Sequence, residues 1–534
     1  MRNLLDLVQS HARRTPDAQA LVCPETVVTY RELVNSAHAF GHALTALDIP
    51  PGARVAIFLD KRVEAVVAML GATAAGGVFV PVNPLLKPAQ VSHVLRDCGA
   101  ACLVTSGLRA HTLAEAGSSP VADVIIVDEP GVPLANLEAA GRIHRWPWTT
   151  AVTPNDVADT TFCKACVDTD LAALLYTSGS TGLPKGVMLS HRNLLEGAWS
   201  VAEYLGHGPS DRILAALPLS FDAGLSQLTS AWAAGATPVL LNYLTAHDAI
   251  AACEREHITA LTGVPPLWMQ LAGAAWSDAA RRRLRYFANT GGRLPLPVLQ
   301  KLRALFPGAK PFLMYGLTEA FRSTFLDPAE VDRRPDSIGK AVPNARVLVV
   351  RPDGTPCEPG EPGELVHTGA FVTLGYWNDT ARTTQRYRPS PEVKPGGAQR
   401  DTAVWSGDLV QRDAEGFLYF IARNDAQIKS SGYRISPEEI EETVHASGLV
   451  DEVAAFGIPD GELGEAVALM VVMTGDTVTT DGVRDWCIKQ LPRYMVPRDI
   501  VRCAEIPRNA NGKFDRAALR TAFAAHASGS GQTS

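Results

Sequence analysis

The first part of the chain alternates short apolar runs with amphipathic stretches. Between residues 22 and 104, runs such as ARVAIFL and GGVFVPV are separated by segments such as RVEAVVAMLGATAA and PAQVSHVLRDCGA. Alternation of buried strands with amphipathic helices is typical of a doubly wound, mostly parallel sheet. We therefore predict an α/β fold for this region.

The same pattern returns after Leu171. ALLYT is predicted to be a strand, RNLLEGAWSVAEYL a helix with one apolar face, and TPVLL, ITALTGV, LRYFANT and KPFLMY further buried strands. The segment from about residue 130 to 167 interrupts the pattern with scattered Pro, Trp and Cys residues. We interpret it as an elaborated connection.

The pattern changes again near Arg346, where shorter apolar runs are separated by turn signals such as RPDGTPCEPGEPG. These features predict an antiparallel or barrel-like subdomain. A small α+β domain is expected to follow, in which SPEEIEE has the form of a capping box, with Ser436 as N-cap, Pro437 next and Glu439 third. The expected division is a core domain over residues 1–423, a mobile domain over 424–522 and a frayed tail over 523–534.

Composition narrows the class of protein. A chain of 534 residues is too long for one core, and 46% hydrophobic with 20% charged residues is usual for globular proteins. The net charge of −7, with one short basic cluster at 281–285, excludes the basic surface that nucleic acid needs. We therefore expect no nucleic-acid partner. Because no apolar stretch reaches membrane-spanning length, we also expect a cytoplasmic protein with no membrane partner.

Nine cysteines are scattered singly, apart from Cys163 and Cys166. An odd number in such a chain argues against a disulfide framework. The CKAC pair has zinc-like spacing but no second pair nearby, so thiols on a linker are the preferred interpretation.

A loop rich in Gly, Ser and Thr lies between two apolar runs, in YTSGSTGLPKGVMLSH from Tyr176 to His191. Glycines allow close approach to phosphate oxygens, hydroxyls add hydrogen-bond donors, and Lys185 adds a positive charge. The loop is not a P-loop, because Pro184 precedes the lysine and Gly186 follows it. A flexible surface turn is the alternative.

The loop TSGSTGLPKG resembles the phosphate loop of the adenylate-forming superfamily, which includes acyl-CoA synthetases, luciferases and the adenylation domains of peptide synthetases. Four further family motifs follow in order: Tyr315-Gly316-Leu317-Thr318-Glu319 for the nucleotide, Trp405-Ser406-Gly407-Asp408 for the ribose, Ala422-Arg423-Asn424-Asp425 for the hinge and Asn511-Gly512-Lys513 for the terminal lysine. The resemblance extends from about residue 4 to 523. The family hinge usually begins Gly-Arg, and this chain has Ala422 there.

The resemblance implies a reaction in two halves, with ATP and Mg²⁺ as cofactors. A carboxylate attacks the α-phosphorus of ATP to give an acyl-adenylate and pyrophosphate, and a thiol then attacks the acyl carbon. The implied nucleotide-binding residues are Thr177, Ser178, Gly179, Ser180, Thr181, Lys185, Gly291, Gly292, Arg293, Tyr315, Gly316, Thr318, Asp408 and Arg423.

The family also implies individual roles. Lys513, Thr318 and Lys185 would be catalytic, Glu319 would bind Mg²⁺, and Asp425 would be the pivot of the small domain. Tyr315 would offer its ring to adenine and Asp408 would accept two ribose hydroxyl protons. Core packing of the tyrosine, a turn at the aspartate and a solvated Lys513 are the alternatives from the residues alone.

The acid-binding pocket is implied by FDAGLSQL, where Phe221 and Asp222 match the position at which amino-acid-activating members bind the substrate ammonium. A carboxylate in an apolar pocket needs such a partner, although Asp222 as the cap of the following helix is the alternative. The remaining implied pocket residues are Ala223, Ser226, Gly263, Asn289, Gly291, Met314, Arg322 and Ser323. Arg322 would meet a second carboxylate or form a structural ion pair.

Two stretches, PVNPLLKPAQVSHVLRDCGA and YGLTEAFRST, are similar to stand-alone L-proline carrier-protein ligases and to exosortase-associated AMP ligases. Those groups show FDYGLNQL where this chain has FDAGLSQL, a change that enlarges the pocket. The implied function is adenylation of a small amino acid and its transfer to the phosphopantetheine thiol of a separate carrier protein. An AMP-forming ligase that joins a non-amino carboxylic acid to coenzyme A and a non-catalytic nucleotide-binding protein are the alternatives.

Overall fold

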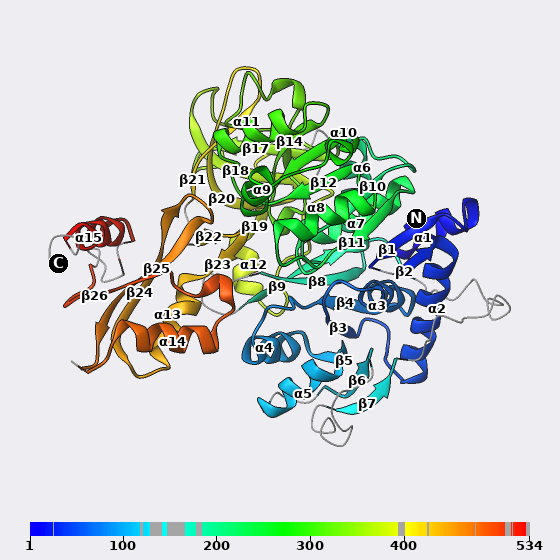
Figure 1. Ribbon diagram of the computed structural model, residues 1–534, viewed down its shortest axis with the longest axis horizontal. Coiled ribbons are helices and arrows are strands. Elements are labelled where there is room, and N and C mark those ends of the chain that lie inside the picture. The colour runs from blue at the N-terminus through cyan, green and yellow to red at the C-terminus, as the bar shows by residue number, and fades with distance from the viewer. Residues whose placement is uncertain are drawn as a thin grey trace.

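The structure is a computed structural model that describes residues 1–24, 26–117, 121–128, 141–146, 166–177, 184–392, 401–423, 427–475, 477–507, 514 and 516–529. A large domain with two layered lobes carries the small C-terminal domain on one side (Figure 1). The N-terminus lies on the opposite side of the large domain (Figure 1).

The longest sheet of the described residues runs through the large domain. Its strand order is β17 (Ala345–Val350), β18 (Pro362–Gly369), β20 (Thr402–Arg412), β21 (Leu418–Arg423), β16 (Ser337–Ala341), β15 (Thr324–Leu326), β14 (Lys310–Tyr315), β13 (Tyr286–Asn289), β12 (Ala260–Gly263), β10 (Arg212–Ala215), β11 (Thr237–Leu240), β1 (Gln19–Cys23) and β2 (Thr26–Thr29), with β19 (Tyr387–Pro389) beside β20. Strands β14 to β1 pair in parallel, whereas β17 to β15 pair antiparallel. The predicted antiparallel part is confirmed, but it begins at β15, before the expected boundary near Arg346, and it continues the same sheet.

A second sheet has the order β7 (Arg142–Arg145), β6 (Asp123–Ile126), β5 (Ala100–Thr105), β3 (Arg54–Phe58), β4 (Val78–Pro81), β8 (Leu171–Thr177) and β9 (Lys185–Ser190). Its pairs are parallel except β8 with β9. In β3, Val55 and Ile57 belong to one core cluster while Ala56 and Phe58 belong to another. Both faces of the strand are therefore buried, which explains its uninterrupted apolar sequence.

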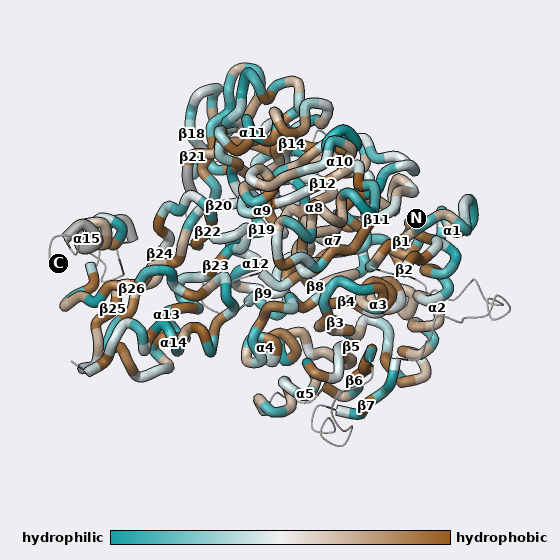
Figure 2. The backbone as a smooth tube through the Cα atoms, in the orientation of Figure 1, coloured by the Kyte–Doolittle hydropathy of each residue, from teal (hydrophilic) through white to brown (hydrophobic). Residues whose placement is uncertain are grey.

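Helices cover these sheets on both faces. Those of the main core are α2 (Tyr30–Ala46), α3 (Val63–Ala74), α6 (His191–Tyr204) and α7 (Asp222–Ala234), with α1 (Leu5–Arg14) beside them. The others are α4 (Pro88–Cys98), α5 (Gly107–Glu115), α8 (Ala246–Arg255), α9 (Pro265–Ala272), α10 (Asp278–Arg283), α11 (Leu296–Leu305), α12 (Thr380–Arg386), η2 (Thr318–Ala320) and η3 (Pro328–Glu330). Every residue from Ala65 to Ala74 in α3 is buried, and Figure 2 shows its hydrophobic colour beside that of the neighbouring strands.

The small domain has its own sheet, with β23 (Tyr433–Ile435), β22 (Ile428–Ser430), β25 (Gly464–Met473) and β24 (Val450–Asp460) in order and β26 (Asp499–Arg502) beside β25. Its helices are α13 (Pro437–His445), α14 (Thr480–Gln490), η4 (Arg493–Met495) and α15 (Arg516–Gly529). Helix α15 extends into the segment expected to be a frayed tail, because Phe523 packs edge-on against Phe456 with ring centroids 5.5 Å apart.

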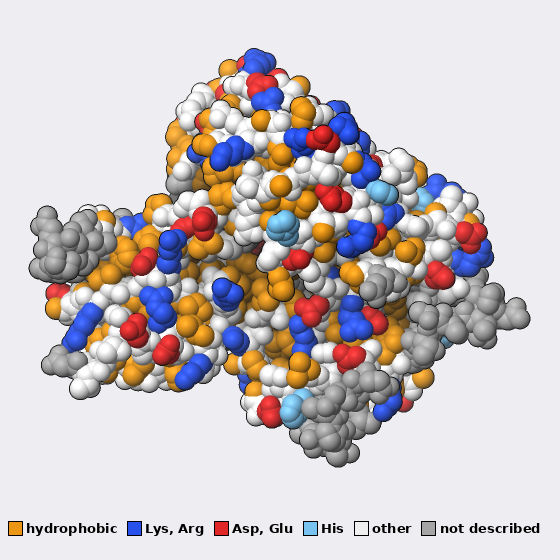
Figure 3. Space-filling view, viewed as in Figure 1, with side chains coloured by type: hydrophobic (Ala, Val, Ile, Leu, Met, Phe, Trp, Pro, Cys, Tyr) orange, Lys and Arg blue, Asp and Glu red, His pale blue; other side chains and the backbone are white. Residues whose placement is uncertain are grey.

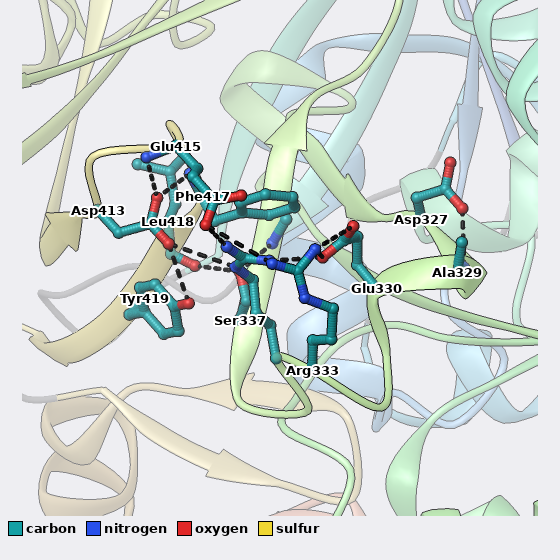
Figure 4. A network of polar contacts seen from close by, with 12 residues as sticks. Asp327, Ala329, Glu330, Arg333, Ser337, Asp413, Glu415, Phe417, Leu418 and Tyr419 are labelled. Atoms are coloured by element: carbon teal, nitrogen blue, oxygen red, sulfur yellow. Dashed lines mark hydrogen bonds and ion pairs between the residues drawn. The ribbon is translucent and has the colours of Figure 1, made fainter.

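An ion-pair network joins the loop before β16 to the turn between β20 and β21 (Figure 4). Arg334 forms ion pairs with Glu330 at 2.5 Å, with Asp413 at 3.4 Å and with Glu415. Asp413 Oδ1 also accepts the backbone N–H of Phe417 at 2.8 Å. These contacts hold the β20–β21 hairpin against the loop before β16. The hairpin also reaches the cleft between the domains.

The predicted capping box at α13 is only half formed. Ser436 accepts the backbone N–H of Glu439, as predicted. The Glu439 carboxylate instead accepts a hydrogen bond from Gln90 Nε2 of α4 at 2.6 Å. The reciprocal half of the prediction was therefore wrong, because a partner in the other domain takes this side chain.

Two observations concern features that the sequence analysis raised. None of the cysteines in the described ranges forms a disulfide bond, and Cys163 lies outside them. Within the same ranges, no helix combines the length and the apolar character needed to cross a bilayer.

Candidate active site

A cavity of about 530 Å³ lies between the large and the small domain. The molecular surface is hollowed where the two domains meet (Figure 3). The loops that follow β12, β13 and β14 open into the cavity from the large domain. The carboxyl ends of parallel strands are the usual position for ligand sites in such sheets.

Most of the described residues expected at the site line this cavity. They are Thr177, Phe221, Asp222, Ala223, Asn289, Gly291, Gly292, Arg293, Met314, Tyr315, Gly316, Thr318 and Arg322. Gly263, Ser226 and Ser323, expected in the acid pocket, are not among the described lining residues, and both serines are buried. Lys185, Glu319 and Asp408, expected at the phosphates, the metal and the ribose, are described but are not lining residues either. Ser178, Gly179, Ser180, Thr181, Asp425 and Lys513 lie outside the described residues, as does the side chain of Arg423.

The glycine-rich loop joins two antiparallel strands. Thr177, the last residue of β8, pairs with Lys185, the first residue of β9. The strand pairing therefore fixes the two residues that flank the loop, whereas residues 178–183 lie outside the described residues.

Lys185 is one of three neighbouring polar side chains at this end of the site. Its Nζ donates to the Tyr376 hydroxyl at 2.8 Å and lies 3.5 Å from Glu319 Oε1, and the same hydroxyl donates to Glu319 Oε1 at 2.7 Å. Burial lowers the pKa of Lys185. Although burial opposes it, the positive charges of Lys185, Arg386 and Arg434 hold the pKa of Glu319 well below its usual value.

The other oxygen of Glu319, Oε2, is buried and has no hydrogen-bond partner among the described residues. The side chain itself is 4% exposed. An ionised carboxylate with one unused oxygen fits a hard divalent cation such as Mg²⁺. Groups of three or more His, Cys, Asp or Glu that would hold a metal without substrate oxygens are absent from the described ranges.

Tyr315, which lines the cavity at the end of β14, contacts Asp408 of β20. The Tyr315 hydroxyl donates to Asp408 Oδ2. Asp408 is fully buried inside β20, so the alternative that it is a turn residue was wrong. Tyr315 is half-buried, and it packs against the core as well as lining the cavity.

The acid pocket contains a pair of opposite charges. Arg322 Nη1 lies 3.7 Å from Asp222 Oδ2, and the two side chains are 6% and 17% exposed. Helix α7 begins at Asp222 with Phe221 as its N-cap, and no side chain caps it. The alternative that Asp222 caps the helix was therefore wrong.

The small domain inserts a glycine turn into the cleft. Gly432 has a φ of +81°, and a Cβ there would lie 2.9 Å from the Val264 side chain. The same turn brings the ring of Tyr433 edge-on to Phe221, with centroids 4.9 Å apart. The acid pocket is thus closed by residues of both domains.

Arg434 follows this turn and is one of the charged lining residues that the sequence analysis did not place at the site. Its Nη2 donates to Gly316 O at 3.3 Å. Although burial opposes it, the negative charges of Glu319 and Asp408 raise the pKa of Arg434. The sequence signal was KSSGYR shortly after the hinge motif, a basic and aromatic turn in a domain from which only Lys513 and the pivot Asp425 were expected.

Two family models match most of the chain. The model described as AMP-binding enzyme matches residues 8–377, and that described as AMP-binding enzyme C-terminal domain matches residues 439–513. Together they include residues of both domains that line the site.

Several curated proteins are similar over nearly the whole chain at 30% identity. The L-proline–[L-prolyl-carrier protein] ligase of Pseudomonas fluorescens aligns over 97% of this chain and 99% of its own length. The long-chain-fatty-acid–CoA ligase of Salmonella typhimurium aligns over 97% and 94%. Tyrocidine synthase 3 of Brevibacillus parabrevis aligns over 97% of this chain, which spans only 8% of that protein.

Solved structures of o-succinylbenzoate CoA synthetase from Bacillus subtilis are also similar. A double mutant of that enzyme with its product analogue OSB-NCoA has a TM-score of 0.80 at 25% identity, with 98% of each chain covered. The same enzyme with ATP and a magnesium ion has a TM-score of 0.65 at 26% identity, with 97% of this chain and 99% of that chain covered.

Proposed function

The chain belongs to the AMP-binding enzyme family, and from this premise we propose that it adenylates a small amino acid with ATP and passes it to the phosphopantetheine thiol of a separate carrier protein. The coarser activity, that of an AMP-forming ligase, is shared by its relatives. The observation that carries the finer proposal is one cavity whose lining includes Arg434 and, in the acid pocket, the carboxylate of Asp222, with the Lys185–Glu319 pair next to the lining residues Pro184 and Thr318.

The phosphate end supports binding of a triphosphate. Lys185 and the hairpin loop would hold the β- and γ-phosphates, and Thr318 would donate to the α-phosphate. Glu319 would hold Mg²⁺, which when bound neutralises charge on the transferring phosphates. Positioned cations of this kind stabilise charge that develops during the transfer.

The nucleoside end has its own candidates. Asp408 would accept the ribose hydroxyls, Tyr315 and the Gly291–Gly292 turn would contact adenine, and Arg423 would approach from the hinge side. Because Tyr315 donates to Asp408 in the described structure, ribose binding would rearrange this hydrogen bond.

The arrangement of the small domain favours the second half-reaction. The turn at Gly432 and Arg434 faces the cleft, and the TM-score is higher for the relative that holds a CoA-type product than for the one that holds ATP. Lys513 would enter the cleft after a rotation about Asp425, to contact the attacking carboxylate. Domains of residues 1–423 and 424–522 with a pivot between them are part of this proposal, as is a cytoplasmic location.

A second candidate is a ligase that joins a non-amino carboxylic acid to coenzyme A. The observation that favours it is the Arg322 guanidinium, which already offers Asp222 a positive charge. The long-chain-fatty-acid–CoA ligase among the relatives belongs to this class by name.

Acid-dependent ATP–pyrophosphate exchange separates these possibilities. We expect a small amino acid to support exchange and Asp222→Asn to lower its kcat/KM by about 10²-fold, because a buried ionic partner of the ammonium is lost. The KM for ATP should stay unchanged. Asp278→Asn, an exposed aspartate on α10, is the matched control.

Two results would contradict the proposal. Undiminished exchange in Asp222→Asn would remove the ammonium site and leave the non-amino acid ligase. ATP binding with no acid-dependent exchange would indicate a non-catalytic nucleotide-binding protein. With exchange established, product formation with a phosphopantetheinylated carrier or with coenzyme A identifies the thiol.

A further inference from the structure

We propose that the acid activated here is an amino acid with a second carboxylate, whose ammonium is bound by Asp222 and whose second carboxylate is bound by Arg322. This inference rests on the proposed adenylation function and names its substrate class. The remaining carboxylate would face Thr318, attack the α-phosphorus and release pyrophosphate, as in the reaction above.

The first support is the unused hydrogen-bonding capacity of Arg322. Its side chain lines the cavity and is 6% exposed, yet its guanidinium makes no hydrogen bond to any residue that the structure describes. A guanidinium has five N–H donors in a planar fork that matches a carboxylate. Burial of such a group without hydrogen bonds is unfavourable unless a ligand supplies the acceptors.

The second support is the length of the Arg322–Asp222 contact. At 3.7 Å the two atoms are too far apart for a hydrogen bond. Elsewhere this chain builds structural pairs that are short and bidentate, as between Arg285 and Asp211 at 2.8 and 3.1 Å. A structural ion pair would be expected to close in the same way. The open geometry is instead that of two charges held apart at the wall of a pocket.

A third polar group adds to this pattern. Asn289 lines the same cavity, and its Nδ2 donates to Gly292 O at 2.7 Å. That bond fixes the orientation of the amide, and Oδ1 is left buried with no partner among the described residues. The pocket therefore offers two kinds of acceptor, Asp222 and Asn289, together with one cationic donor.

The turn that carries Arg322 is held rigidly. The preceding residue, Phe321, is fully buried and has a φ of +46°, which is rare for a residue with a side chain. Its ring fills the space left by Gly197 of α6, where a Cβ would lie 2.1 Å from the ring. Strained backbone that packing holds in place is typical of functional sites. This packing fixes the backbone position from which the Arg322 side chain reaches the pocket.

Charge balance decides between substrate classes. An amino acid with only an ammonium would draw Asp222 away from Arg322 and leave a buried guanidinium uncompensated. A dicarboxylic acid without an ammonium would pair with Arg322 and leave the carboxylate of Asp222 without a compensating positive charge. A substrate with both groups keeps the pocket neutral and supplies partners to both side chains.

The test uses three five-carbon acids that differ by one charged group: glutamate, norvaline, which lacks the second carboxylate, and glutarate, which lacks the ammonium. Aspartate, 2-aminobutyrate and succinate form the matched four-carbon series. With the full-length wild-type protein, we expect the kcat/KM for pyrophosphate exchange to be at least tenfold higher for the acidic amino acid of one series than for its two partners. Equal or better exchange with either partner would overturn the inference.

A variant then assigns the effect to Arg322. Arg322→Met keeps the length of the side chain without its charge, and we expect it to lose the preference for the second carboxylate while the KM for ATP stays unchanged. Arg322→Lys retains the charge but not the planar fork of N–H donors, so it should raise the KM for the acidic amino acid. It should also fold if the Arg322→Met variant fails to fold. Arg303→Met, at an exposed ion pair on α11, is the control.

The outcomes separate this inference from the proposed function. If Arg322→Met lowers exchange equally for all three acids, the arginine has only a structural role and the inference fails. If proline, fatty or aryl acids support exchange and acidic amino acids do not, the inference fails while adenylation stands. If no acid supports exchange, the proposed function fails and the inference fails with it.

Discussion

Lys185 shows how a residue with a recognisable motif acquires its properties from neighbours that the motif does not contain. Its place in TSGSTGLPKG predicted a phosphate ligand. The structure adds Tyr376, which lies far along the chain and hydrogen-bonds to both Lys185 and Glu319. The ring of Tyr376 also lies under the ammonium, 4.0 Å from Nζ to the centroid. This contact keeps the lysine charge directed at the site.

Replacement of this charge tests the phosphate end of the site. We expect Lys185→Met to lower the kcat/KM for pyrophosphate exchange by about 10²-fold or more, because one preorganised cation that stabilises the transferring phosphates is lost. The KM for ATP should rise as well. Lys301→Met, an exposed lysine on α11, should behave as wild type. Unchanged exchange in Lys185→Met would remove the lysine from the proposed mechanism.

At the scale of elements, the contact between α13 and α4 links the two domains. Gln90 uses its Oε1 to accept the backbone N–H of Lys87 at the start of α4 and its Nε2 to reach Glu439. Tyr494 and Met495 of η4 lie beside this pair in the cavity wall. Burial raises the pKa of Glu439 to about 7, with a further contribution from Glu442, although the Gln90 hydrogen bond opposes it.

This raised pKa predicts a pH-dependent stability. Below the ordinary value of 4.5 the Glu439 carboxyl is protonated in both the folded and the unfolded protein. The contribution of this residue to the free energy of unfolding is therefore fully present there. As the pH rises through about 7, the buried form must lose its proton in a poorly solvated position, and the contribution is lost. The difference in the free energy of unfolding is at most about 3.5 kcal/mol, at ~1.4 kcal/mol for each unit of pKa.

Thermal unfolding between pH 5 and pH 8 measures this effect. Glu439→Gln mimics the protonated side chain, so its Tm should match that of wild type at pH 5 and exceed it at pH 8. Asp485→Asn, at an exposed position on α14 of the same domain, serves as the control. A Tm difference between Glu439→Gln and wild type that is the same at both values of pH would contradict the raised pKa.

At the scale of the whole molecule, one end of the small domain lies at the cleft and the other end lies away from the large domain. The turn at Gly432 faces the cleft, whereas α15 lies at the end of the small domain away from the large domain (Figure 1). Phe514, the described residue next to Lys513, packs with the cluster around Phe456 and Leu519 that covers α15. The proposed role of Lys513 would require a rotation of the small domain between the two half-reactions.

Two variants should therefore affect opposite half-reactions. We expect Lys513→Ala to lower pyrophosphate exchange by about 10²-fold or more while leaving thiol transfer from a supplied acyl-adenylate within severalfold of wild type. Arg434→Ala should lower thiol transfer more than exchange, because this arginine enters the cleft in the described arrangement. Equal losses in both half-reactions for both variants would argue against a domain rotation.

The amino-acid sequence by itself determined the α/β pattern, the division into a parallel and an antiparallel part, and the order of the motifs, because these depend on local spacing and on residue chemistry. Only the tertiary structure decided which side chains meet across the chain. Gln90 with Glu439, Tyr376 with Lys185 and Arg322 with Asp222 come from distant segments, and no local pattern encodes their distances. The capping box shows the physical reason, since a side chain with two possible partners takes the one that burial between domains makes more favourable.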